Sequence, residues 1–497
     1  MKKKLYFILL LFIGSALPSC KDFLDEQPLH SLTGDNAIKD LSTAKAALGG
    51  VYASFQNDSW SGALYVAQAT KSGFVNITAQ TDYDLTYNES NPGTNIPVIW
   101  QSFYKSLNAA NFAIQGIGKL SDAAVPLPER TAMLAEGRCL RAWIHANLLW
   151  NFGHWWAEDA DAYGIIYRDE VISLKNVLKA RSTVGESYQK IYEDLDYAIA
   201  NLGEFSSPRY LSKQFAKALK AKLLLYRGGY RNTVADLQLS LTLVNEILAN
   251  PSASFAMESN LAEVYSNAWD SKENLFVRYL EDDGSRASKG GFTYTYGIIY
   301  GGDRLPLPID KTLTAGLKYG ADWFKADPRW PIVTGAVRAP ETWDDKQCYC
   351  FKKLARLGRY AGAQANPKDE KYAAYYFRYS ELYLMKAELL ARTGAAISTA
   401  IAPINEMRSK RTNPVLAPLN PQNSEELMDL IFKEIFMELF MENGSEMFAT
   451  VRFKKDGQPW IVAIKENKAF ELNKLCWPIP RVEMVNNTLM VQNPDLK

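Results

Sequence analysis

Apolar residues recur along most of the chain with the spacing of amphipathic helices. Three segments share the pattern A-x-L-L-x-x-x-G, at 146–153, 221–228 and 387–394. In each, the leucines fall on one helix face, the alanine lets a neighbouring helix approach, and the glycine is typical of the left-handed position that ends a helix. Further helical stretches follow the second and third segments, at 233–250 and 396–411. This order predicts helical hairpins that pack on one another.

The remaining pattern predicts a mainly α fold. Further helices are predicted at 41–56, 101–119, 128–152, 184–202, 212–227 and 424–442. Strand signals are short and few, and the helix-turn-helix units are similar to tetratricopeptide-like stacking, although their spacing is irregular. Long loops are predicted at 57–97, 157–181 and 282–371. The last is too long for an idle connection, so we expect it to form a functional surface or a subdomain.

The N-terminus has the pattern of an export signal. A basic start, "MKKK", precedes an apolar run at 5–17, which is shorter than the about 20 residues that a membrane-spanning helix needs. Small residues come directly before Cys20, as in a bacterial lipobox, so we expect residues 1–19 to be removed and Cys20 to be lipidated. Several acyl chains would then anchor the protein without spanning the membrane. The alternative is an ordinary signal peptide with an incidental cysteine.

Charge and cysteine content exclude several classes of protein. The formal net charge is +1, so the chain lacks the excess of basic residues that is typical of a nucleic-acid-binding protein. Beyond Cys20, the cysteines are Cys139, Cys348, Cys350 and Cys476, too few and too irregular for a disulfide framework. The pair at 348 and 350 lacks neighbouring ligands, so it is a weak metal signal. The 497 − 19 = 478 remaining residues suffice for one large domain with its own core.

Materials for catalysis are scarce. The three histidines are His30, His145 and His154, and no H-E-x-x-H, G-x-S-x-G or P-loop motif accompanies them. A glycosidase needs only two carboxylates about 5 to 10 Å apart, and no motif marks such a pair among the 55 acidic residues. The stretch "YLEDDGS" at 279–285 offers oxygen ligands but lacks the spacing of a calcium-binding EF-hand, which favours a solvated turn. The sequence therefore predicts no catalytic site and no cofactor.

Aromatic residues are unusually frequent, at 12% of the chain. Most must belong to the core, yet several lie in predicted loops, where an exposed ring flanked by polar side chains fits the flat face and hydroxyl rim of a sugar. In the segment at 292–296, rings alternate, so one face of an extended strand would show three of them. The candidate ligand-binding residues are Trp60, Asp82, Tyr83, Asp84, Tyr87, Asn88, Phe292, Tyr294, Tyr296, Tyr300, Arg304, Trp323 and Trp343. For each ring the alternative is packing beneath its own loop.

Six ordered blocks resemble the motifs of one family. They are "CKDFLD" at 20–25, "WQSFYKSLNAANFAI" at 100–114, "AEGRCLRAWIHANLLWNFG" at 135–153, "RSTVGESYQKIYEDL" at 181–195, "FRYSELYLMKAELLARTG" at 377–394 with "INEMRSKR" at 404–411, and "WPIPRVEMVNN" at 477–487 with "QNP" at 492–494. Together they resemble the SusD/RagB-like outer-membrane lipoproteins of Bacteroidetes, which partner TonB-dependent transporters in nutrient capture.

The last predicted helix departs from the family pattern. Where the family has E-R-x-x-E-L-x-x-E-G-x-R-x-x-D-L-x-R-W, the chain reads "KEIFMELFMENGSEMFATVRF". Ile435, Glu446 and Ala449 stand where the family has Arg, Arg and Asp, while Glu438 and Arg452 remain. We expect these replacements to change local packing rather than function.

The resemblance implies a mainly α, SusD-like fold with a tetratricopeptide-like scaffold and a loop-rich ligand-binding insertion. It implies one domain at 20–497, in which an N-terminal portion at 20–280 and a C-terminal portion at 281–497 are interleaved. Members of the family hold glycans on an aromatic arc to which an N-terminal loop and the long insertion contribute. Because their binding residues vary, the resemblance supports the regions of our candidates and not each residue.

The expected function is non-catalytic capture of glycan at the cell surface for a SusC-like TonB-dependent transporter. The acidic leader after Cys20, at 21–26, resembles signals for display on the outer face of the outer membrane. A RagB-like peptide-binding protein is the alternative, since fold does not fix the ligand. Two further alternatives remain. The protein is an enzyme on this scaffold if it cleaves bonds in its ligand, and it has a purely structural role if it binds no ligand.

Overall fold

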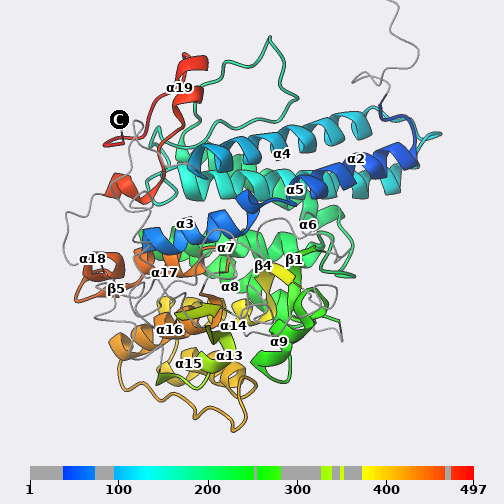
Figure 1. Ribbon diagram of the computed structural model, residues 1–497. Helices are drawn as coiled ribbons and strands as arrows, with labels where there is room; N and C mark the ends of the chain where they lie inside the picture. Colours follow the sequence, from blue (N-terminus) through cyan, green and yellow to red (C-terminus); the bar gives the residue numbers. More distant parts are fainter. Residues whose placement is uncertain are drawn as a thin grey trace, which may run out of the picture.

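The computed structural model describes residues 37–72, 95–250, 254–280, 326–337, 348–351, 372–440, 442–464 and 472–496, and all structural statements concern these residues. This part of the chain is mainly helical, as the sequence predicts, and its few strands are short. Figure 1 shows long helices running side by side in an upper layer, with a second group of helices and the strands below them.

The upper layer contains the first three long helices. They are α2 (Leu41–Ser54), α4 (Asn95–Gly118) and α5 (Leu127–Phe152), and α6 (Val184–Asn201) packs against α5. The side chain of Asp40 caps α2, and that of Thr183 caps α6, each within a reciprocal capping box. All four helices match predicted ones, although α4 begins six residues earlier than predicted. Pro97 lies in its first turn, where a missing N–H costs no intrahelical bond.

Two predicted helical hairpins are present in the lower group. The first joins α7 (Lys213–Arg231) to α8 (Val234–Leu248), and the second joins α14 (Tyr379–Arg392) to α15 (Ile397–Arg408). The other elements with helical turns are η1 (Asp58–Trp60), α3 (Gly62–Ser72), α9 (Leu261–Asn267), η3 (Ala268–Asp270), α13 (Trp330–Val333), α16 (Ser424–Leu439), α17 (Ser445–Arg452), α18 (Trp460–Ile464), η8 (Leu472–Leu475) and α19 (Arg481–Asn486). Helix α14 contacts both α8 and α16, so the hairpins stack as expected.

The shared glycine of the A-x-L-L-x-x-x-G pattern ends only one helix in the predicted way. Gly394 has φ +82° just after α14. Gly153 follows α5 with an extended backbone, and Gly228 lies inside α7, which ends instead at the left-handed Asn232. A Cβ on Gly228 would lie 2.8 Å from Cβ of Asp236, so this glycine allows α8 to approach α7 closely.

Within the described residues, the strands form three two-stranded antiparallel ladders. The first pairs β1 (Asn274–Leu280) with β4 (Tyr372–Arg378), the second pairs β2 (Thr334–Val337) with β3 (Cys348–Phe351), and the third pairs β5 (Lys454–Lys455) with β6 (Gln458–Pro459). In the first ladder Leu280 pairs with Tyr372. The chain between these two residues therefore leaves and rejoins the scaffold at one point, as expected for an insertion.

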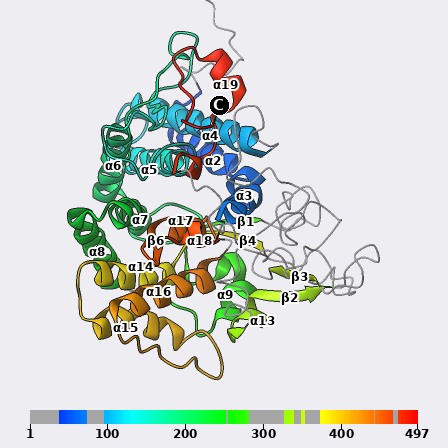
Figure 2. The same cartoon turned by 90° about the vertical axis from the view of Figure 1, so that its left-hand side faces the viewer.

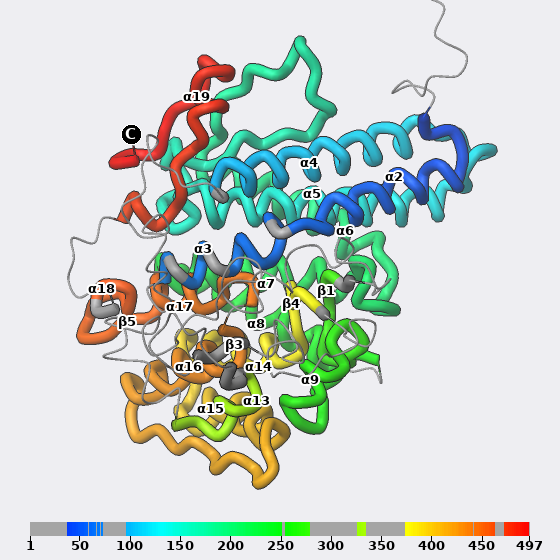
Figure 3. Tube along the Cα trace, in the orientation of Figure 1, coloured from blue at the N-terminus to red at the C-terminus, as the bar shows by residue number. Residues whose placement is uncertain are grey.

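The predicted loop at 57–97 is partly wrong, because it contains α3. Helix α3 packs against α17, far away in sequence, and Figure 3 shows the blue α3 beside the orange α17. Gly444, with φ +67°, permits this approach, since a Cβ there would lie 2.5 Å from the side chain of Gln68 on α3. The residues at 157–181 contain neither helix nor strand, as predicted.

Candidate ligand-binding region

Trp60 is the one candidate binding residue that lies within the described part of the chain, and its prediction is wrong. Its side chain is fully buried. The ring contacts Phe55, Phe103 and Trp143 at centroid distances of 4.7, 4.2 and 4.8 Å. Because the chain forms η1 and α3 here instead of a loop, the ring points into the core. Tyr65, on α3, is buried too, and its hydroxyl donates to the carbonyl of Tyr375 at 3.2 Å.

The other candidates lie outside the described residues. They are Asp82, Tyr83, Asp84, Tyr87 and Asn88 in 73–94, Phe292, Tyr294, Tyr296, Tyr300, Arg304 and Trp323 in 281–325, and Trp343 in 338–347. Cys20, His30 and most of the acidic turn at 279–285 also lie outside them. The assignment of these candidates to ligand binding therefore stays a prediction. The structure shows the scaffold elements from which the segments that contain them begin.

The two candidate segments start from neighbouring elements. Residues 73–94 follow α3 directly, and 281–371 depart from the Leu280–Tyr372 end of the β1–β4 ladder. The bond from Tyr65 to Tyr375 joins α3 to β4. Figure 2 shows α3, β1, β4, β2 and β3 on the same side of the molecule. Both aromatic-rich segments therefore leave the scaffold from elements on one side of the molecule.

Arg278 fixes β1 to the turn that precedes α3. Its guanidinium donates to the carbonyl of Asn57 at 2.9 Å, to Oγ of Ser61 at 2.6 Å and to Oε1 of Gln56 at 3.1 Å. The side chain is only 2% exposed, so these charge-assisted bonds replace its hydration. No sequence motif marks Arg278, because its partners are 217 or more positions away.

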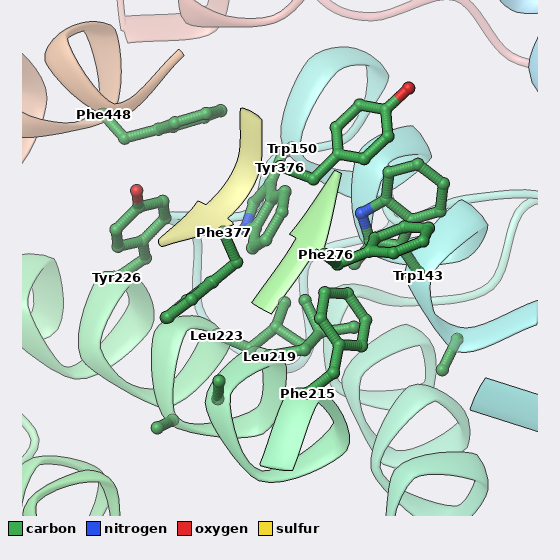
Figure 4. Packing of buried hydrophobic residues seen from close by; sticks show 14 of the residues in the cluster. Trp143, Trp150, Phe215, Leu219, Leu223, Tyr226, Phe276, Tyr376, Phe377 and Phe448 are labelled. Carbon is green, nitrogen blue, oxygen red and sulfur yellow. The ribbon is translucent and has the colours of Figure 1, made fainter. Parts of the chain in front are cut away.

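Aromatic residues of the described chain form the core beneath this region. Figure 4 shows Trp143, Phe215, Phe276 and Tyr376 packed together from α5, α7, β1 and β4. Phe276 lies at the centre, with centroid distances of 5.2 Å to Trp143, 5.0 Å to Phe215 and 5.1 Å to Tyr376. Edge and tilted contacts of this kind stabilise cores beyond the area they bury. Much of the high aromatic content therefore serves packing.

A buried ion network holds the other end of the β1–β4 ladder. Arg378, the last residue of β4, donates to Glu273 at 3.0 Å, to Glu438 at 3.1 Å and to Glu442 at 2.7 Å. Arg411 binds Glu273 at 2.7 Å and Glu438 at 3.1 Å. Burial raises the pKa of Glu438, but Arg411 and Arg378 lower it more, so that it falls to about 2. The network fixes the ladder to α16 and to Arg411, which follows α15.

Two residues that the family pattern retains lie in such buried pairs. Glu438 belongs to the network of Arg378, and Arg452 binds Glu388 through two bonds of 2.8 Å. Ile435 and Ala449, which replace charged residues of the pattern, are buried in the hydrophobic core. Both side chains therefore contribute apolar packing at positions where the pattern has a charge.

The C-terminal "QNP" motif closes the end of α5. Gln492 accepts from the backbone N–H of Ile479 and donates to its carbonyl, both at 2.8 Å. Asn493 donates to the carbonyls of Phe152 at 3.0 Å and Trp477 at 2.8 Å. Both amide side chains are buried. This motif is therefore structural, since its polar atoms satisfy backbone groups that would otherwise be left unpaired.

The two described histidines, His145 and His154, are buried among structural contacts. Burial lowers the pKa of His145 well below its usual value, and its Nε2 accepts from the N–H of Arg168 at 3.2 Å. Burial lowers the pKa of His154 to about 4, although Asp161 lies 3.4 Å away. Both rings are therefore neutral near pH 7. Among the described residues, no group of three or more His, Cys, Asp or Glu side chains has an arrangement that would hold a metal ion.

Cys139 and Cys476 are free thiols, and both are buried. Burial raises the pKa of each thiol. In the part of the chain that the structure describes, no helix combines the length and apolar content needed to cross a membrane.

Comparison with known proteins identifies the family. Residues 22–226 match a family model described as "Starch-binding associating with outer membrane", and residues 319–495 match the model of the SusD family. A relative from Formosa agariphila, SusD-like protein P2, is 26% identical over 99% of both chains. The description of the first model is that of binding proteins associated with the outer membrane.

Solved structures share the fold. A laminarin-binding SusD-like protein superposes with a TM-score of 0.67 at 19% identity, covering 92% of this chain and all of that one. Surface glycan-binding protein A from Bacteroides uniformis superposes with a TM-score of 0.68 at 16% identity, covering 91% of this chain and 99% of that one. With these matches over nearly its whole length, the chain belongs to the SusD/RagB-like family of outer-membrane binding proteins.

Proposed function

We propose that this protein is a non-catalytic, cell-surface lipoprotein that binds glycan and delivers it to a SusC-like TonB-dependent transporter. One observation carries the ligand-binding part of the proposal. The segments at 73–94 and 281–371, which contain most of the aromatic candidates, start from one side of the scaffold, where α3 and the β1–β4 ladder meet. Aromatic rings on two segments that begin at neighbouring elements would form one platform for the faces of sugar rings.

The family and its relatives support a glycan as the ligand. One matching model is described as starch-binding, and two structural neighbours are described as binding laminarin and surface glycan. A peptide ligand would instead favour strand edges and charged pockets. The rings and amides of "TDYDLTYNESN" and "GGFTYTYGIIYGGDR" fit the sugar better.

A binding panel tests this proposal. The lipid-free protein from residue 21 onward would be titrated with plant, host and microbial polysaccharides and with mixed peptides. We expect binding to at least one glycan, and chromatography of the glycan afterwards should show an unchanged chain length. Binding of peptides alone would overturn the proposal, and shortened glycan products would show that the protein is an enzyme.

The location is proposed from the leader sequence. Lipidation of Cys20 would anchor the chain in the outer membrane, and the acidic residues that follow would direct it to the outer face. Protease treatment of intact cells should then degrade the protein, while a periplasmic control protein stays intact. Survival of the full-length protein under these conditions would contradict surface display.

A further inference from the structure

A pocket of about 370 Å³ lies in the helical scaffold, and its lining residues belong to neither aromatic segment. It is formed by the loop before α7, the first turns of α7, the last turn of α8 and residues shortly after α8. We call it the α7–α8 pocket. Its volume falls within the range of small-molecule sites, about 300 to 1,000 Å³. Figure 2 shows α7 and α8 on the side of the molecule away from β2 and β3, which belong to the long insertion.

The floor of the α7–α8 pocket is apolar and partly aromatic. Ile247 and Phe255 are buried there, while Phe205 is partly exposed. The rings of Phe205 and Phe255 lie 5.2 Å apart between centroids, and Phe255 in turn contacts Tyr379 of α14 at 4.9 Å. The hydrophobic core therefore supports the floor from below. A partly exposed ring in a pocket of this kind offers a flat apolar surface on which the C–H face of a sugar can stack.

Ion pairs form the rim of the pocket. Nζ of Lys213 lies 3.2 Å from Oε1 of Glu204, and Nζ of Lys217 lies 2.8 Å from Oε2 of Glu246. Two lysines and two glutamates leave the rim without net charge. Both carboxylates are exposed, and ion pairs at a protein surface contribute at most about 1 kcal/mol to stability. A ligand can therefore take up hydrogen bonds from these groups at little cost to the fold.

The walls of the pocket are held together without a ligand. The N–H of Phe205 donates to Oε1 of Gln214 at 2.7 Å, and Nε2 of Gln214 donates to Glu204, so the loop is fixed to the first turn of α7. The ion pair of Lys217 with Glu246 joins α7 to α8. A site that is already formed loses less conformational entropy when its ligand binds.

A neutral polyhydroxyl ligand fits this chemistry best. Each hydroxyl of a sugar donates one hydrogen bond and accepts others, so neighbouring hydroxyls can donate to the glutamate and accept from the lysine of one ion pair. The side-chain amides of Gln214 and Asn250 add planar donors and acceptors to the lining. An anion or a cation would meet attractive and repulsive charges in equal number. A peptide would favour strand edges or charged pockets, whereas this lining is mainly helical and has no net charge.

We propose that the α7–α8 pocket is a saccharide-binding site that takes a single neutral sugar residue. This inference goes beyond the proposed function and does not depend on it, because the lining residues belong to the scaffold and not to the aromatic segments. A glycan long enough to reach both places would be held with greater avidity than either site provides alone.

Saturation-transfer NMR on the lipid-free protein from residue 21 onward tests the pocket. The probes are the methyl glycosides of glucose, galactose, mannose, xylose and N-acetylglucosamine, with trialanine as the peptide probe. We expect at least one glycoside to bind in the millimolar range. Lys217→Met combined with Glu246→Ala should weaken this binding at least fivefold, because both charged hydrogen-bonding groups of one ion pair are removed. Phe205→Leu should weaken it as well, since it keeps an apolar side chain but removes the ring.

An ion pair outside the pocket supplies the matched control. Lys190 and Glu193 on α6 form an exposed pair at 3.1 Å, so Lys190→Met combined with Glu193→Ala should leave glycoside affinity unchanged. Thermal unfolding would show that each variant is folded. The proposal would be overturned if no glycoside bound the wild-type protein, if trialanine alone bound, or if the folded double variant at Lys217 and Glu246 kept wild-type affinity.

Two outcomes separate this inference from the proposed function. Polysaccharide binding that is lost in Tyr83→Ala and Tyr296→Ala, without glycoside binding by the wild-type protein, would overturn the α7–α8 pocket alone. Glycoside binding that depends on Lys217 and Glu246, with polysaccharide affinity unchanged in Tyr83→Ala and Tyr296→Ala, would overturn the aromatic segments alone.

Discussion

Trp60 shows how one residue can mislead a sequence-based site prediction. It follows a turn-forming "QNDS" stretch, which favours an exposed loop, yet its ring is buried among Phe55, Phe103 and Trp143. The chain turns inward here because Arg278, from a distant strand, binds the backbone of this turn. Only the folded structure brings these residues together, so local pattern carries no signal for their contact.

We predict that Trp60→Ala destabilises the fold without acting on the ligand. Removing a fully buried ring should lower the free energy of unfolding by about 3 to 5 kcal/mol, because a cavity replaces its contacts. Urea unfolding followed by tryptophan fluorescence or circular dichroism would measure this. Unchanged stability combined with loss of glycan binding would show instead that Trp60 contacts the ligand.

The buried Glu438 predicts a pH dependence of stability. The pKa of Glu438 falls from the usual 4.5 to about 2 in the folded protein. The stabilisation that its carboxylate gives to the folded state is therefore fully present above pH 4.5 and is lost as the pH falls toward 2. Glu438→Gln should cost about 3 to 5 kcal/mol at pH 7, because it leaves Arg378 and Arg411 partly uncompensated. The difference between wild type and variant should shrink between pH 4.5 and 2.

Unfolding free energies at several pH values would check this, with Glu425→Gln as the matched control. Glu425 is exposed in the first turn of α16, so its variant should follow the wild-type curve. A constant difference between wild type and Glu438→Gln across this range would contradict the account of the ion network.

At the scale of elements, helices were predictable and their exact ends were not. Apolar periodicity locates α2, α6 and α8 within a few residues because each buries one face of the helix. Helices α5 and α7 are located as well, although the runs at 139–152 and 221–226 are buried on every side. The glycine signal failed at Gly228 because a glycine that permits close helix packing looks the same in sequence as one that ends a helix. Helix α3 was missed because its buried polar residues obscure the apolar stripe.

We predict that Gly444→Ala lowers stability by more than the cost of placing alanine in a left-handed backbone, because it also disturbs the contact between α3 and α17. Gly444 has φ +67°, and a Cβ there would lie 2.5 Å from the side chain of Gln68. Gly457 has φ +80° with open space around it, so Gly457→Ala isolates the backbone cost of about 1 to 2 kcal/mol. Thermal unfolding should therefore show a larger loss for Gly444→Ala, and equal losses would contradict the close approach of the two helices.

At the scale of the whole molecule, the scaffold brings separate parts of the sequence to common places. The β1–β4 ladder gathers both ends of the long insertion, and α3, which directly precedes residues 73–94, is hydrogen-bonded to β4. Helix α4 contacts both Ile38, near the start of the described chain, and the loop at 157–181. The family and the fold class were predictable from ordered motifs over nearly the whole chain. The identity of the ligand-contacting side chains was not, because an aromatic ring in a predicted loop can equally pack into the core, as Trp60 does.

The central claim is that rings on the two inserted segments bind glycan, and calorimetric titration of the lipid-free protein tests it most directly. With a glycan that binds the wild-type protein, Tyr83→Ala and Tyr296→Ala should each weaken Kd about tenfold or more, which corresponds to about 1.4 kcal/mol. Tyr210→Ala, at an exposed ring in the loop before α7, should leave Kd unchanged. Wild-type affinity in both Tyr83→Ala and Tyr296→Ala would contradict the account.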